Sequence, residues 1–278
     1  MRADQRARRD AFLSLIGTRP VVMGVLNITP DSFSDGGSFQ SADTALAHAD
    51  KMIRAGADIV DVGAESTRPG AVAVSEADEL ARLEPVMTAL AERGATLSVD
   101  SYKAATAARA VALGTILIND VWGLQRDPAM AETVAASEAA VVIMHNRAEK
   151  DRALDIVADI RRFFDRSLAL AATAKIPDER IILDPGIGFA KTSQQNIDAV
   201  RRLGELRDYG RPILVGVSRK KFLGRWTGNG AEGELAGTIA ACLAAAAAGA
   251  SLFRVHDVAE HVAALQVFHA IHGAAKAR

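Results

Sequence analysis

Polar and charged side chains follow eight short apolar runs of this 278-residue chain. They are Asn27, Asp61, Asp100, Asn119 with Asp120, His145, Asp184, Ser218 with Arg219 and Lys220, and Arg254 with His256. Carboxylate and amide oxygens accept hydrogen bonds, whereas lysine and arginine donate them and attract anions. A polar residue at a strand end is common by itself, so the inference depends on all eight ends together. The set predicts a site for a ligand that combines N–H groups with negative charge.

Three of these positions are aspartates that end the second, third and sixth runs, namely Asp61, Asp100 and Asp184. They are too far apart in sequence for a calcium-binding loop, and no paired histidines or cysteines accompany them, so no structural metal is expected. A carboxylate in a dry site needs donors, and Asp184 should therefore face Lys220 or a ligand that presents N–H groups. Aspartate, asparagine and lysine together suit a heterocycle that displays an amino group, a ring N–H and a carbonyl. Guanine-like and pterin-like edges both fit.

Arg254 and His256 alternate on the last run, and Asn27 ends the first run. Alternate residues of a strand point the same way, and the first and last strands become neighbours if the sheet closes. These residues predict an anion site, although His256 alone could be an ordinary neighbour of a helix cap. His48, His261, His269 and His272 lie in helical segments and are assigned no chemistry.

The eight apolar runs are expected to be strands, because they are short, rich in Val and Ile, and continuously apolar, as strands buried on both faces are. They cover 21–27, 58–63, 96–100, 115–120, 140–145, 181–186, 212–218 and 251–256. Helical patterns lie between them, such as Leu80, Leu83 and Met87 after a Ser75 cap. Strand and helix alternate without a linker, which predicts a single domain over 1–278, with a core of about 20–272 and an N-terminal extension over 1–18. The predicted fold is α/β, a (β/α)₈ TIM barrel.

Composition excludes several classes of protein. The formal net charge of -1 gives no general attraction for nucleic acid or an anionic membrane. The single cysteine, Cys242, lies in an Ala-rich run and is expected to be a buried helix residue. The N-terminus has no apolar segment of signal-peptide length, and the Ala-rich run 236–253 is better explained as a core helix and strand than as a membrane span. A cytoplasmic location is expected.

Seven segments give the chain a family resemblance. In order, they are "GVLNITPDSFSDGG", "DVGAESTRPGA", "SVDSYK", "IND", "LDPGIGFAKT", "GVSRKKFLG" and "RVHDV". They resemble the motifs of the dihydropteroate synthases, and each stands at a strand end that the barrel prediction requires. The resemblance implies a transferase of folate synthesis that condenses 6-hydroxymethyl-7,8-dihydropterin diphosphate with p-aminobenzoate and releases diphosphate. It also implies Mg²⁺ as cofactor, sulfonamides as mimics of p-aminobenzoate, and a homodimer.

The resemblance assigns roles to individual residues. The pterin would contact Asp100, Asn119, Asp184, Lys220, Met144, Phe189 and Gly216. The diphosphate would contact Asn27, which is also the magnesium-linked position, with Thr67, Arg68, Arg254 and His256. The p-aminobenzoate pocket would comprise Phe33, Thr67, Pro69, Phe189, Ser218 and Lys221. Asp100, Lys220 and Arg68 are the expected catalytic residues.

The family's chemistry is dissociative: diphosphate leaves first, and the arylamine then captures a pterin-stabilised cation. In this family the loops after the first two strands fold over the diphosphate. In the second of these loops, "STRPG" at 66–70, Arg68 would bring charge, Thr67 a hydroxyl and Pro69 stiffness. A surface turn would also explain this Pro-Gly segment.

The chain departs from the family pattern at three places. Ala190 stands where glycine is usual, Lys221 stands where serine is frequent, and "NRAEKD" at 146–151 differs from the longer stretch of several relatives. Two alternative functions are a pterin-barrel methyltransferase that uses methyltetrahydrofolate and a non-catalytic pterin-binding paralogue. The methyltransferase would not need "STRPGA" or a diphosphate site, and the paralogue would be expected to have damaged loops.

Overall fold

The computed structural model describes residues 1–28, 38–65, 73–227 and 230–273. Its elements in chain order are α1 (Ala3–Leu15), β1 (Val21–Asn27), α2 (Ser38–Arg54), β2 (Ile59–Gly63), α3 (Glu76–Glu92), β3 (Leu97–Asp100), α4 (Ala104–Leu113), β4 (Leu117–Asp120), α5 (Met130–Ser137), β5 (Ala140–Met144), α6 (Ile156–Thr173), the 3₁₀ helix η2 (Asp178–Arg180), β6 (Ile181–Asp184), α7 (Ser193–Arg201), the 3₁₀ helix η3 (Leu203–Tyr209), β7 (Leu214–Val215), α8 (Gly224–Thr227), α9 (Ala231–Ala247), β8 (Leu252–Val255) and α10 (Val258–Gly273). Each predicted strand has its counterpart among them.

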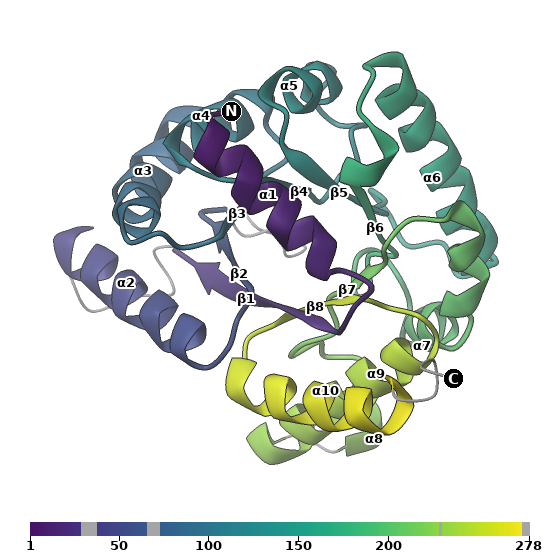
Figure 1. The fold of residues 1–278 in the computed structure, drawn as a ribbon. Helices are drawn as coiled ribbons and strands as arrows, with labels where there is room; N and C mark the ends of the chain where they lie inside the picture. The colour runs from purple at the N-terminus through teal and green to yellow at the C-terminus, as the bar shows by residue number, and fades with distance from the viewer. Residues whose placement is uncertain (29–37, 66–72, 228–229, 274–278) are drawn as a thin grey trace.

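The eight strands of the described chain form one parallel sheet in the order β6-β5-β4-β3-β2-β1-β8-β7. The two outer strands of this order meet where Leu183 bridges Ile213 and donates its N–H to Pro212 O at 2.9 Å. The sheet is therefore a nearly closed barrel, and the helices surround it (Figure 1). The predicted TIM barrel is confirmed. Only β7 is much shorter than predicted, and Pro212, at the start of the predicted run 212–218, has no N–H to donate to a ladder.

Alternate residues of the strands divide the core into two clusters. Val21 and Met23 of β1 belong to the cluster inside the barrel, whereas Val22 belongs to the larger cluster between strands and helices. The inner cluster also contains Ile59, Leu117, Val142, Ile182, Leu214 and Leu252. Both faces of the sheet are apolar, which explains why the strand sequences are continuously apolar.

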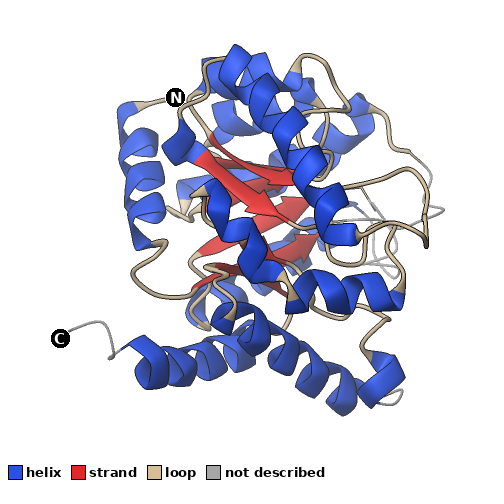
Figure 2. Ribbon diagram, turned by 90° about the vertical axis from the view of Figure 1, so that its right-hand side faces the viewer, coloured by secondary structure: helices blue, strands red, loops and turns tan. Residues whose placement is uncertain are grey.

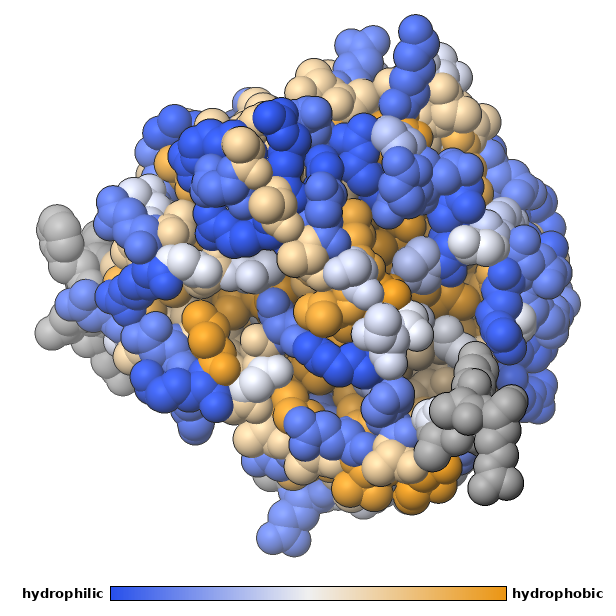
Figure 3. Space-filling model, viewed as in Figure 1, coloured by the Kyte–Doolittle hydropathy of each residue, from blue (hydrophilic) through white to orange (hydrophobic). Residues whose placement is uncertain are grey.

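Helix α1 covers the N-terminal end of the barrel. Phe12 packs into the inner cluster and is only 2% exposed, and the buried Gln5 amide donates to Val111 O at 2.9 Å and Thr115 O at 2.6 Å. In Figure 2 the strand arrows point away from this helix. Hydrophilic residues dominate the outer surface of α1, with apolar residues visible beside it (Figure 3). The segment expected to be an extension thus closes one end, and a site has to lie at the other.

Local signals in the sequence also agree with the helices. Ser75 accepts a hydrogen bond from the Asp78 N–H and caps α3, as predicted. Cys242 is buried in α9, and burial raises the pKa of its thiol to about 12. None of the helices in the described ranges is long and apolar enough to cross a membrane.

Candidate active site

The polar residues at the strand ends continue the inward-facing rows of the barrel core. Asp61, Asn119, Met144, Asp184, Gly216 and Arg254 each stand two positions after an inner-cluster residue, namely Ile59, Leu117, Val142, Ile182, Leu214 and Leu252. Because side chains on a strand alternate between faces, each of these positions faces the barrel interior. The strand sequences thus build an apolar floor and, one layer above it, a polar chamber at the C-terminal end.

The strand register brings four of these ends to one level. Asn27 pairs with Gly63, Gly63 with Asp100, and Asp100 with Asn119. Gly63 leaves room at this level, because a Cβ atom there would lie 3.3 Å from the Cβ of Asp100. Asp100 and Asn119, both predicted to bind a ligand, are therefore neighbours at the mouth.

A network of charged hydrogen bonds connects the eighth strand with the second and third. Arg254 donates through Nε to Asp61 Oδ2 at 2.7 Å and through Nη2 to Asp100 Oδ2 at 2.7 Å. Asn119 Nδ2 donates to the same Asp61 oxygen at 3.0 Å. Burial alone would lower the pKa of Arg254, but Asp61 and Asp100 raise it above its usual value. Arg254 is therefore a permanent cation in the chamber.

Three acceptor oxygens of this network have no partner in the structure. Asp61 Oδ1, Asp100 Oδ1 and Asn119 Oδ1 are all buried without a hydrogen bond. Burial raises the pKa of Asp100 to about 7, and Arg254 opposes this rise. Unsatisfied buried acceptors are costly, and a ligand that presents N–H groups would satisfy them.

Asp184 forms the opposite wall of the chamber, beside Met144 in the register. Its Oδ1 accepts the Gly186 N–H at 2.7 Å, and burial raises its pKa to about 6. The Lys220 ammonium lies 4.4 Å from the centroid of the Phe189 ring, and its charge also lowers the pKa of Asp184. Asp184, Lys220 and Phe189 are thus close together, as the sequence predicts.

The residues expected to bind an anion do not lie at one level of the barrel. His256 Nδ1 lies 3.0 Å from Ser218 Oγ, and burial together with Arg254 lowers the pKa of His256 to about 4. Arg254 is level with Met23 rather than Asn27, which stands four residues further along β1. The guanidinium is directed at Asp61 and Asp100 in this structure, so Asn27 and Arg254 approach the chamber from different heights.

Three of the remaining predicted residues follow the sixth and seventh strands. Phe189 is half-buried, Ser218 is buried and Lys221 is exposed. Phe33, Thr67, Arg68 and Pro69 lie outside the described residues. Among the described residues on either side of 66–72, the Glu65 carboxylate and the Val74 carbonyl both contact Lys103 Nζ. Ala190 has a φ of 42°, a backbone conformation in which glycine is favoured.

Sequence reasoning missed three residues that the structure places in or beside the chamber. The sequence pattern marks Asp61 and His145 only as polar strand ends and assigns Lys191 no role. Asp61 binds both Arg254 and Asn119, and Lys191 Nζ lies 2.7 Å from His145 Nδ1. The available signals were the inward position of Asp61, two residues after Ile59, and a lysine inside the glycine-rich segment that follows β6.

The described residues contain no group of three His, Cys, Asp or Glu side chains that could hold a metal ion. Asn27 supplies one amide oxygen at the mouth, which is a donor that Mg²⁺ accepts. The donor set suits an ion that takes most of its ligands from water and a bound diphosphate. It does not suit a dedicated protein cage.

Comparison with known proteins agrees with this geometry. A family model described as pterin binding enzyme matches residues 23–256. The dihydropteroate synthase of Bacillus subtilis is 44% identical over 241 residues, which are 86% of this chain and 84% of that protein. A dihydropteroate synthase structure from Clostridium difficile, determined in the presence of pteroic acid, is 44% identical with a TM-score of 0.90, over 92% of this chain and 98% of the other. One from Xanthomonas albilineans with 4-aminobenzoic acid is 43% identical with a TM-score of 0.87, over 91% and 93% of the two chains. The chain therefore belongs to the dihydropteroate synthase family of pterin-binding enzymes.

Proposed function

We propose that the chamber condenses 6-hydroxymethyl-7,8-dihydropterin diphosphate with p-aminobenzoate to give 7,8-dihydropteroate and diphosphate. The observation that carries the proposal is the set of buried, unpartnered acceptors, Asp61 Oδ1, Asp100 Oδ1 and Asn119 Oδ1, in the chamber that also contains Asp184 and Lys220. A pterin edge offers an amino group and ring N–H groups to these acceptors and a carbonyl oxygen to Lys220. Met144, Phe189 and Gly216 would line the faces of the ring.

Arg254, His256 and Asn27 would receive the diphosphate, together with Thr67 and Arg68. The support is chemical: Arg254 is a cation in a dry setting, and a neutral His256 whose Nδ1 engages Ser218 can donate through Nε2. Asn27 would hold Mg²⁺ that arrives with the diphosphate. When bound, this ion would neutralise charge on the leaving group.

In the proposed reaction the bond between the exocyclic carbon and the diphosphate oxygen breaks, and its electron pair leaves with the oxygen. The carbon becomes a cation that the pterin ring stabilises by delocalisation. Asp100 contributes negative charge nearby, while Arg254 and Arg68 stabilise the departing anion. The arylamine nitrogen then forms the new carbon–nitrogen bond, and its surplus proton passes to water.

The p-aminobenzoate would occupy the rim beyond the pterin. Phe189 offers an apolar wall to the aryl ring, and Ser218 and Lys221 offer a hydroxyl and a cation for the carboxylate. Phe33, Thr67 and Pro69 complete this proposed pocket. Pteroic acid and 4-aminobenzoic acid are present in two of the structures to which this chain is similar. This supports the proposed pterin site and the proposed p-aminobenzoate site.

Mass spectrometry of a reaction mixture tests the proposal. The protein, Mg²⁺, the pterin diphosphate and p-aminobenzoate should yield 7,8-dihydropteroate, whereas an Asp100→Asn variant should be strongly impaired. Pterin binding without any product in the parent protein would identify a non-catalytic pterin-binding protein and contradict the proposal.

We also propose a homodimer. Val267 and Ile271 of α10 are 60% and 67% exposed, which leaves apolar area on a long helix. Light scattering after size exclusion should give twice the mass of one chain, and a monomer at micromolar concentration would contradict it. Binding of sulfonamides and a cytoplasmic location stay predictions.

A further inference from the structure

Lys191 is an almost completely buried lysine that the proposed reaction does not use. It is 3% exposed and lies in the segment between β6 and α7. Its Nζ lies 2.7 Å from His145 Nδ1, 2.7 Å from Gly186 O and 3.3 Å from Phe189 O. These three acceptors match the three donors of an ammonium group.

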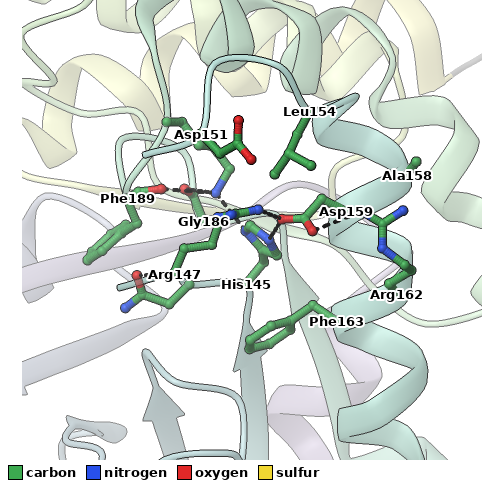
Figure 4. Close-up of polar contacts among 12 residues, drawn as sticks. His145, Arg147, Asp151, Leu154, Ala158, Asp159, Arg162, Phe163, Gly186 and Phe189 are labelled. Atoms are coloured by element: carbon green, nitrogen blue, oxygen red, sulfur yellow. Dashed lines mark hydrogen bonds and ion pairs between the residues drawn. The ribbon is translucent and has the colours of Figure 1, made fainter. Parts of the chain in front are cut away.

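His145 connects this ammonium to Asp159 of α6 (Figure 4). The imidazole is completely buried, and its Nε2 lies 3.2 Å from Asp159 Oδ2, which also accepts from Arg147 at 2.5 Å. Burial and Lys191 lower the pKa of His145 to about 4. The ring is therefore neutral, accepts from Lys191 at Nδ1 and donates its Nε2 proton to Asp159.

The same lysine holds the segment that carries Asp184. The Gly186 N–H binds Asp184 Oδ1 while the Gly186 carbonyl binds Lys191. Gly186 has a φ of 65°, and a Cβ atom there would lie 1.9 Å from the His145 carbonyl oxygen. The segment is therefore tightly folded around the Lys191 ammonium. Phe189, the second proposed pterin residue of the segment, is bound through its own carbonyl.

Lys191 also acts on Asp184 through charge. Burial raises the pKa of Asp184, and after the Gly186 N–H the strongest opposing influence is Lys191, ahead of Lys220 and Arg254. Conversely, burial lowers the pKa of Lys191 to about 7. Among the nearby charges, that of Asp184 opposes this decrease most strongly.

We propose that Lys191, anchored through His145 to Asp159, is a positioning residue of the pterin site that keeps Asp184 ionised and oriented for the pterin N–H groups. The inference deepens the proposed function and rests on the pterin role of Asp184 given there. It assigns to the glycine-rich segment a counter-cation that does not itself contact the substrate.

The test is the pH dependence of pteroic acid affinity, measured by calorimetry between pH 5.5 and 8.5. Asp184 is faced by Lys191 from its own segment, Lys220 after β7 and Arg254 on β8, and Asp100 is another carboxyl of the chamber with a raised pKa. Lys191→Met retains these side chains, but loss of the ammonium also removes a charge that lowers the pKa of His145. The difference between the two curves therefore reports on Lys191 with Asp184 and His145, and the His145 variants below separate the two.

Lys191→Met should move the acidic limb of the affinity curve to higher pH, because Asp184 loses a charge that lowers its pKa. A shift of about one unit, from about 6 to about 7, makes affinity about threefold weaker near pH 6.5 and about eightfold weaker at pH 5.5, and leaves it nearly unchanged at pH 8.5. The exposed Lys150→Met should follow the parent curve. A Lys191→Met curve that is lowered equally at every pH would show a purely structural role and overturn the proposal.

Two substitutions of His145 test the anchor even if Lys191→Met fails to fold. His145→Asn keeps an oxygen acceptor near the position of Nδ1, whereas His145→Gln keeps a donor near Nε2 and loses the acceptor for Lys191. The Gln variant should shift the curve in the direction of Lys191→Met, and the Asn variant should stay closer to the parent. Identical curves for the two variants would overturn the role of His145. If Asp184→Asn bound pteroic acid as tightly as the parent, the proposed pterin site itself would fail, which distinguishes the two claims.

Discussion

Arg254 Nε, on the eighth strand, lies 2.7 Å from Asp61 Oδ2 on the second. The strand between them, β1, pairs with both β8 and β2, so the pairing of the first strand with the last brings together two residues that are 193 positions apart. Asp61 is completely buried and also accepts from Asn119. One carboxylate thus orients a proposed diphosphate residue and a proposed pterin residue.

Asp61→Ala should destabilise the fold by about 3–5 kcal/mol, because it leaves part of a buried cation and a buried amide without their acceptor. Asp61→Asn keeps the shape and one acceptor oxygen, so a loss of about 1–2 kcal/mol is expected. Urea unfolding checks both values. An Ala variant as stable as the parent would show that the Asp61 network does not contribute to the stability of the fold.

Asp184→Asn should weaken pterin affinity by about 2–3 kcal/mol, because a charged acceptor for ligand N–H groups becomes neutral. Calorimetry with pteroic acid measures this directly. A folded variant with unchanged affinity would refute the assignment of Asp184.

The same substitution should make the ligand-free protein more stable at neutral pH. A carboxyl whose pKa is raised from 3.8 to about 6 binds more protons folded than unfolded between these pH values. Ionisation of Asp184 therefore leaves the free energy of unfolding unchanged below pH 4 and lowers it by about 3 kcal/mol above pH 6. Asp184→Asn removes that cost, so its melting temperature should exceed the parent's at pH 8 and approach it near pH 4. A variant that is less stable at both pH values would contradict this account of Asp184.

Segment 66–70 should matter for turnover more than for pterin binding. Replacing it with a Gly-Ser linker should leave pterin affinity largely intact while lowering turnover, because the proposed role of this loop is to exclude water from the cation. Arg68→Ala alone should cost about 2–4 kcal/mol of transition-state stabilisation. Steady-state kinetics and equilibrium pterin binding, measured on the same variants, test this prediction. Normal turnover of the linker variant would make the segment an ordinary turn, and equal losses of affinity and turnover would place it in the ground-state site.

Much of the barrel was predictable because its signals are local. Continuous apolar runs marked the strands, and counting them gave the barrel. The positions of Asp100, Asn119 and Asp184 at strand ends were enough to place them at one mouth.

The side-chain pairing inside the chamber was not predictable in the same way. Adjacency of β1 and β8 suggested that Arg254 would lie beside Asn27, but strand register and side-chain reach direct it to Asp61 and Asp100. The contact of Lys191 with His145 depends on how the segment between β6 and α7 folds around an ammonium, including Gly186 in a left-handed conformation. Such contacts depend on geometry across distant segments, which no local pattern encodes.

The most direct test of the central claim is the initial rate of diphosphate release from the pterin diphosphate, with Mg²⁺ present, measured with and without p-aminobenzoate. The account predicts that p-aminobenzoate raises the sustained rate and that one dihydropteroate forms for each diphosphate released. Release that is indifferent to p-aminobenzoate, or that yields no dihydropteroate, would contradict it.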